Sequence, residues 1–90
     1  MAYTINNTAG TTLVTLADGK IDTTTTDLTL IGKGYAGFGE RLNENFVKLL
    51  ENFANTSAPS NKQKGQLWYD SLNNQLNVYT GSKFKPVGST

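Results

Sequence analysis

The sequence predicts a small α+β fold, in which antiparallel β-sheet elements flank one amphipathic helix and a β-meander closes the C-terminus. Three observations predict it. Residues 1–31 are rich in threonine and β-branched side chains, residues 40–54 carry apolar side chains at helical spacing, and residues 65–87 alternate short aromatic or apolar runs with turn residues. Strands, one helix and strands again, in that order, are typical of an α+β architecture.

Length and composition limit both the core and the chemistry. A chain of 90 residues forms one small domain, and surface scaling predicts that about 64% of its unfolded surface is buried on folding. Such a core is marginal without disulfides or metal, so we expect partners. There is no cysteine and no histidine, which excludes thiol nucleophiles, Cys/His zinc sites and an imidazole base. A net charge of +1 gives no signature of nucleic-acid or membrane binding.

The N-terminal third is predicted to be β-structure. We expect residues 1–31 to form an N-terminal β arm or hairpin, and residues 32–90 a helix plus C-terminal β-hairpin module, in a single small domain overall. Residues 11–16 read as a strand, and Asp18-Gly19 is typical of a type I′ hairpin turn that leads into a returning strand. Residues 3–5 form either a short strand or an arm that orders only against a partner.

A glycine-rich break precedes the helix. Residues 32–37 fit the pattern G-x-G-x-x-G, but no βαβ unit follows, so a hinge that packs Tyr35 and Phe38 is favoured over a nucleotide site. The helix predicted over residues 40–54 gathers its apolar side chains on one face. Those side chains belong to Leu42, Phe46, Leu49, Leu50 and Phe53. This face is either core or an interface across a symmetry axis, and the sequence leaves both alternatives open.

The C-terminal part is predicted to form three strands, at residues 65–70, 75–80 and 83–87. Asp70 precedes a turn and should accept hydrogen bonds from its backbone amides. Pro86 cannot donate to a ladder, so the last strand should lie at an edge or end there. Strand alternation places Trp68 and Tyr69 on opposite faces, which argues against one stacking platform built from all the aromatic residues of this part.

The sequence offers no constellation for catalysis. The serines have no histidine to activate them, and the carboxylates are scattered over turns and one helix face. We therefore expect a protein that is not an enzyme, with no catalytic residues, no cofactor and no metal. There is also no secretory signal and no apolar run that could span a membrane.

Two segments resemble a module of tail-fibre-like and other virion structural proteins of tailed bacteriophages, of the T-even-like cyanophage type. The first runs from Leu30-Ile31-Gly32-Lys33-Gly34-Tyr35 through Gly37-Phe38-Gly39-Glu40 into Asn43-Glu44-Asn45-Phe46 and Leu49-Leu50-Glu51-Asn52-Phe53-Ala54. The second is Gly65-Gln66-Leu67-Trp68-Tyr69-Asp70, followed by Leu76-Asn77-Val78-Tyr79-Thr80-Gly81 and Phe84-Lys85-Pro86-Val87. Together they cover about residues 28–88.

The resemblance implies a virion component of a tail fibre, baseplate or neck assembly, synthesised in the bacterial host cytoplasm. It implies a homo-trimer that contacts other phage virion proteins, and it supplies no catalytic residues. Its implied mode of action is oligomerisation and docking, without nucleic acid or membrane. The candidate core or interface residues are Tyr35, Phe38, Phe46, Leu50, Phe53, Trp68, Tyr69 and Tyr79. The alternative is a carbohydrate- or host-receptor-binding module that uses exposed aromatic side chains on a host-surface glycan.

Overall fold

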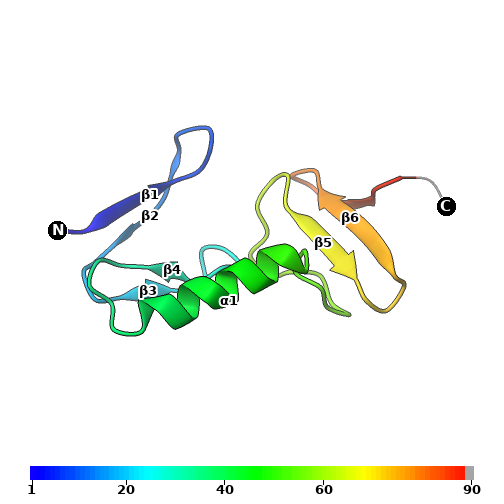
Figure 1. Cartoon of the computed structure of the whole chain (residues 1–90). Coiled ribbons are helices and arrows are strands. Elements are labelled where there is room, and N and C mark those ends of the chain that lie inside the picture. The colour runs from blue at the N-terminus through cyan, green and yellow to red at the C-terminus, as the bar shows by residue number, and fades with distance from the viewer. Residues whose placement is uncertain (89–90) are drawn as a thin grey trace. The chain divides into compact units, whose positions relative to one another are not determined.

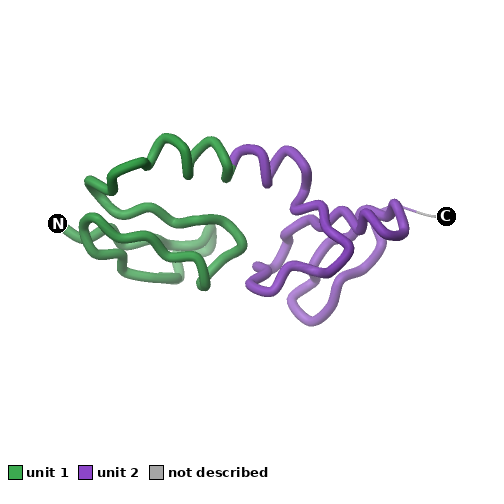
Figure 2. The backbone as a smooth tube through the Cα atoms, turned by 90° about the horizontal axis from the view of Figure 1, so that it is seen from below, with its two compact units in different colours: residues 1–45 green, residues 46–90 purple. Residues whose placement is uncertain are grey.

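A computed structural model describes residues 1–88, and within them seven strands form three antiparallel sheets beside one helix (Figure 1). The predicted α+β class with a C-terminal β-meander is confirmed. By its contacts the chain divides into two compact units, residues 1–45 and 46–90 (Figure 2). The sequence suggested a division after residue 31 instead. The helix α1 (Phe38–Leu50) is one continuous element that begins in the first unit and ends in the second.

The first unit contains two small sheets. Strand β1 (Tyr3–Asn6) pairs with β2 (Thr12–Leu16), so the N-terminal segment is a strand within this chain. Strand β3 (Ile21–Asp22) pairs with β4 (Leu30–Ile31). The hairpin predicted around Asp18-Gly19 is therefore wrong, because the strands on its two sides pair elsewhere. Among these two turn residues only Gly19 has a positive φ, 74°, whereas a type I′ turn needs both central residues there.

Gly32 connects this turn to the segment that follows β4. Its N–H donates to the Lys20 carbonyl at 2.7 Å. A Cβ atom at position 32 would lie 2.4 Å from the Ala17 carbonyl oxygen and 2.7 Å from that of Lys20. The close approach of the backbone therefore requires glycine at position 32. This glycine is explained without a phosphate-binding loop.

The helix begins at Phe38 and ends at Leu50, whereas the sequence predicted residues 40–54. Two left-handed residues end it, Asn52 at φ 53° and Phe53 at φ 55°. The Phe53 N–H donates to the Lys48 carbonyl at 2.9 Å and the Asn52 N–H to Leu49 at 3.1 Å, which is the Schellman pattern. Phe53 thus lies outside the helix, so its predicted place on the helical face is wrong. Asparagine tolerates the left-handed conformation, which explains why the helix ends here.

The second unit is built on the meander β5 (Leu67–Asp70), β6 (Gln75–Tyr79) and β7 (Phe84–Pro86), in that order. The chain just after the helix runs along the free edge of β5. Tyr69 N–H donates to Asn52 O at 2.9 Å, and Asn55 N–H donates to Tyr69 O at 3.2 Å. This segment covers an edge that would otherwise be open to pairing. Strand β7 lies at the other edge and ends at Pro86, as predicted.

Candidate functional site

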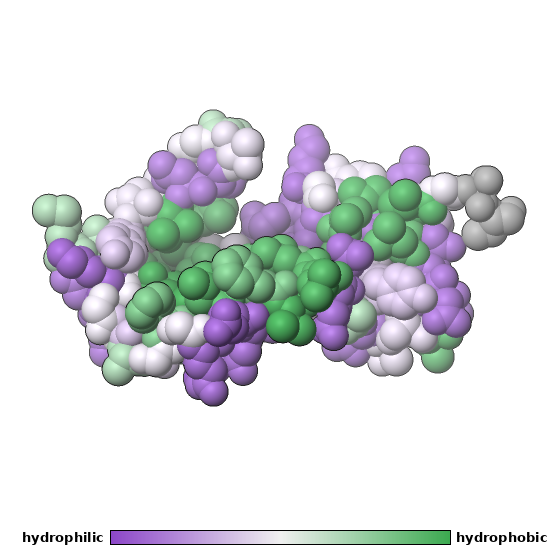
Figure 3. Space-filling model, viewed as in Figure 1, coloured by the Kyte–Doolittle hydropathy of each residue, from purple (hydrophilic) through white to green (hydrophobic). Residues whose placement is uncertain are grey.

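Apolar side chains of α1 remain exposed along one side of the helix. We call this surface the apolar stripe; it consists of Phe38, Leu42, Phe46, Leu49 and Leu50. Their exposed fractions are 59, 38, 56, 48 and 82%. Within residues 1–88, Leu16 is the one large apolar residue that is buried, with 4% exposed. A single chain therefore does not use the stripe as its core, and green apolar surface is visible over the helix in Figure 3.

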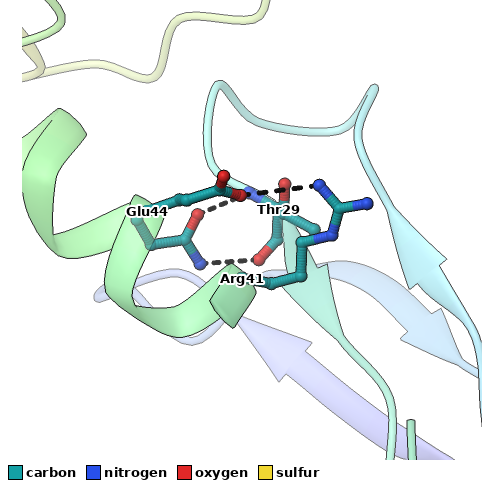
Figure 4. Close-up of polar contacts among 4 residues, drawn as sticks. Thr29, Arg41 and Glu44 are labelled. Carbon is teal, nitrogen blue, oxygen red and sulfur yellow. Dashed lines mark hydrogen bonds and ion pairs between the residues drawn. The ribbon is translucent and has the colours of Figure 1, made fainter. Parts of the chain in front are cut away.

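The buried residue of α1 is a polar one, Asn45, and it joins the helix to the segment before β4. Its side-chain Oδ1 accepts from the Thr29 N–H at 2.9 Å, and its Nδ2 donates to the Thr29 carbonyl at 2.7 Å (Figure 4). Asn45 thus satisfies both backbone groups of Thr29, as a paired strand would. This contact turns the Asn45 side of the helix inward, and it leaves the neighbouring stripe exposed.

Charged side chains of the helix lie away from the stripe. Helical spacing places Glu40, Glu44 and Lys48 on the opposite side. Arg41 forms an ion pair with Glu44, 3.5 Å between Nη1 and Oε1 (Figure 4). A hydrogen bond to the Tyr35 side chain, followed by the charges of Tyr35 and Glu44, raises the pKa of Arg41. None of the five side chains of the stripe carries a charge.

A pocket of about 370 Å³ opens beside the N-terminal end of the stripe. Phe38 and Leu42 of the stripe form one wall. The remaining lining comes from Tyr3 of β1, Ile31 of β4 and residues 32–35 of the glycine-rich segment, where Lys33 is the one charged lining residue. All of these residues belong to the first unit. The pocket offers a mainly apolar wall, with Tyr3, Tyr35 and Phe38 as its aromatic members, to a small apolar group.

The second candidate surface is an aromatic cluster on the meander, made of Trp68, Tyr79 and Phe84. The ring centroids of Trp68 and Phe84 are 5.2 Å apart with an interplanar angle of 63°, and those of Tyr79 and Phe84 are 5.1 Å apart at 51°. Lys62 Nζ lies 5.6 Å from the Tyr79 ring centroid. The Trp68 indole N–H donates to the Asn55 carbonyl at 3.2 Å. Trp68 and Tyr79 thus both pack on Phe84, and all three residues are half-buried.

The ladder register explains why three aromatic residues gather here while Tyr69 does not. Trp68 pairs with Asn77, and Tyr79 pairs with Phe84, so these side chains share a face. Tyr69 pairs with Leu76 on the opposite face, and its hydroxyl donates to Asn74 Oδ1 at 3.1 Å. Sequence alternation separated Trp68 from Tyr69 but missed the gathering of the other three, because the register between β6 and β7 is set by their turn.

The predicted interface candidates thus divide into two groups and two isolated residues. Phe38, Phe46 and Leu50 belong to the stripe, and Tyr35 lines the pocket beside it. Trp68 and Tyr79 belong to the aromatic cluster. Phe53, in the helix-ending turn, and Tyr69, on the far face of the meander, are both half-buried and join neither surface.

The carboxylates of Asp22 and Asp70 serve their own turns. Asp70 accepts from the backbone N–H groups of Leu72 and Asn73, as predicted, and from the Asn73 side chain at 2.8 Å. The Asn73 side chain is the main cause of the lowered pKa of Asp70. The backbone and side-chain hydrogen bonds of Thr25, followed by the Thr24 backbone, lower the pKa of Asp22. A general acid needs a raised pKa, so these carboxylates do not suit that role.

Within residues 1–88, no cluster of three or more acidic side chains is placed to hold a metal ion. In the same part of the chain, the helix is too short and too polar to cross a bilayer. Comparison of the chain with models of protein families, with curated proteins and with solved structures finds no match in any of the three.

Proposed function

We propose that this protein is a non-enzymatic structural component of a phage virion, in a tail fibre, baseplate or neck assembly, and that it acts by oligomerisation and by docking to neighbouring virion proteins. The observation that carries the proposal is the exposed apolar stripe on α1. Its members expose on the order of 500 Å² of apolar surface, which is large for a chain of this size and marks interaction sites. The resemblance of two segments to phage virion proteins supports the particle as the setting.

The scarcity of buried apolar side chains supports assembly independently. A chain whose one buried large apolar residue within residues 1–88 is Leu16 gains little stability from its own core. Association removes the stripe from water and adds the missing burial, at about 25 cal/mol for each Å² covered. A net charge of +1 imposes little repulsion between copies. The resemblance implies three copies around an axis, and the first experiment measures this number.

The proposal is tested in two steps. Light scattering of the purified chain between about 10 and 500 μM should show a defined oligomer, because covering the stripe is favourable. Mass spectrometry and labelled-antibody electron microscopy of gradient-purified particles should then find the chain at the tail or neck. A chain that stays monomeric and is absent from purified particles overturns the proposal.

The aromatic cluster favours a second candidate function, the binding of a host-surface carbohydrate. Sugar rings stack on aromatic faces, and Trp68, Tyr79 and Phe84 lie together on one side of the meander with Lys62 beside them. The cluster is half-buried, and Lys62 already lies over the Tyr79 ring. These contacts explain the cluster as local packing too, so assembly remains the leading proposal.

A glycan array separates this candidate from the first. Binding by the cluster should fall by about two- to tenfold in Phe84→Ala, since one stacking ring contributes about 0.5–1.5 kcal/mol. Tyr69→Ala is the matched control, because Tyr69 lies on the opposite face. Circular dichroism checks that both variants keep their fold. An array without hits, or equal losses in both variants, rejects carbohydrate binding by this cluster.

A further inference from the structure

The apolar stripe has a protruding end and a hollow end. At the C-terminal end of α1, Leu50 is 82% exposed, more than any other member of the stripe. At the N-terminal end, Phe38 and Leu42 form one wall of the pocket of about 370 Å³. A cavity of roughly 150 Å³ already holds a benzene-sized apolar group, so this pocket has room for a leucine side chain.

We propose that two copies of this chain pair through their stripes with their α1 helices antiparallel, so that Leu50 of each copy enters the pocket of the other. This inference rests on the self-association proposed above, and it names the partner and the orientation. Phe46 lies midway between Leu42 and Leu50 in the sequence. A two-fold axis at Phe46 therefore sets Leu50 opposite Leu42 of the second copy, with about 12 Å between the two positions along each helix.

The arrangement fills both pockets at once, which a parallel arrangement does not do. Parallel helices would set Leu50 against Leu50 and pocket against pocket, so the protruding ends would collide and the hollow ends would stay empty. A protruding side chain that fills a hollow on its partner is the kind of fit that specific interfaces show. The antiparallel pair has two-fold symmetry, whereas the resemblance implies three-fold symmetry. Parallel helices around a three-fold axis would also set Leu50 against Leu50 and leave the pockets empty.

Area and chemistry agree with a second copy as the occupant. Two stripes of about 500 Å² each bury on the order of 1,000 Å², the lower limit for a specific interface. The stripe carries no charged residue, and the pocket has Lys33 as its one charged lining residue. An uncharged apolar surface is complementary to itself, whereas a strongly charged partner would find nothing to pair with here.

Orientation is tested by cross-linking, because the chain has no cysteine of its own. Leu50→Cys and Leu42→Cys are prepared separately, one of them labelled with ¹⁵N, and are oxidised alone and mixed. The antiparallel pair predicts that the mixed disulfide forms at least about tenfold more than either homodimer, since residue 50 faces residue 42 of the other copy. A dominant Leu50→Cys homodimer overturns the orientation and leaves self-association standing.

Association itself is tested with a charge placed at the protruding end. Leu50→Glu should weaken dimerisation at least about 100-fold by analytical ultracentrifugation, because two leucine contacts are lost per dimer. Leu72→Glu is the matched control, since Leu72 is 70% exposed in the turn between β5 and β6, outside the stripe, and its dimerisation should be unchanged. Equal effects of the two variants overturn the docking of Leu50. A wild-type chain that is monomeric at 500 μM overturns this inference and the proposed self-association together.

Discussion

The side-chain amide of Asn45 makes two hydrogen bonds to the backbone of Thr29, 2.9 Å from the Thr29 N–H to Oδ1 and 2.7 Å from Nδ2 to the Thr29 carbonyl. Only 9% of Asn45 is exposed, and within α1 it is the buried residue. We call these two hydrogen bonds the Asn45–Thr29 clamp. In the first unit they hold the helix against the segment before β4, whereas most helix–sheet contacts are held by apolar packing.

Asn45→Ala should destabilise the chain by about 2–3 kcal/mol, because it removes two hydrogen bonds and leaves both polar groups of Thr29 partly buried without these partners. Urea unfolding followed by circular dichroism measures the change. Asn43→Ala on the same helix is exposed and should change stability by less than about 0.5 kcal/mol. Equal effects of the two substitutions would show that the clamp contributes nothing.

Gly32→Ala should destabilise the first unit by about 2–3 kcal/mol or more, since its Cβ would lie 2.4 Å from the Ala17 carbonyl oxygen and force the backbone apart. Gly39→Ala tests the opposite sign. Position 39 lies in α1 with nothing near its Cβ, so alanine should stabilise by up to about 1 kcal/mol. Thermal unfolding of both variants checks the pair, and a stable Gly32→Ala chain would contradict the close approach of the two backbones.

The helix end gives a third prediction. Asn52 has a φ of 53°, a conformation that glycine adopts without strain and β-branched residues strongly avoid. Asn52→Gly should therefore leave stability within about 0.5 kcal/mol or raise it, whereas Asn52→Val should cost about 1–2 kcal/mol. Amide hydrogen exchange should also accelerate at Tyr69 in the valine variant, because the Tyr69 N–H donates to the Asn52 carbonyl. A valine variant of unchanged stability would exclude the Schellman end.

Stability should fall in acid below the ordinary carboxyl range. Hydrogen bonds lower the pKa values of Asp22 and Asp70 from 3.8. Their stabilising contribution is therefore complete above pH about 4, and it is lost as the pH falls through the lower folded pKa values. NMR titration of the two carboxyl carbons measures both pKa values. In Asp70→Asn the loss of stability below pH 4 should be smaller than in the wild type, and an identical acid profile would argue against the Asp70 contribution.

Several features could be predicted from the sequence because their causes are local. Helical spacing of apolar residues placed an amphipathic helix, alternation and turn residues placed the three C-terminal strands, and Asp70 was correctly expected to bind the amides of its turn. The α+β class follows from these elements alone. The absence of cysteine and histidine also limited the chemistry before any fold was known.

Strand partners and exposure depended on tertiary structure. The sequence paired residues 11–16 with the strand that follows Asp18-Gly19, but β2 pairs with β1 and β3 pairs with β4, because strand partners are decided by contacts far apart in the chain. The register of β6 and β7, which brings Phe84 beside Tyr79, is likewise a long-range property.

The sequence by itself determined that α1 carries an apolar face, since helical spacing is written in the order of residues. Whether that face is core or surface depended on what the rest of the chain places against it. In the folded chain, the Asn45–Thr29 clamp occupies the adjacent side of the helix, and Phe46 and Leu50 stay exposed. Burial depends on which surfaces meet in three dimensions, and so only the tertiary structure could show that this chain leaves the apolar face of α1 exposed.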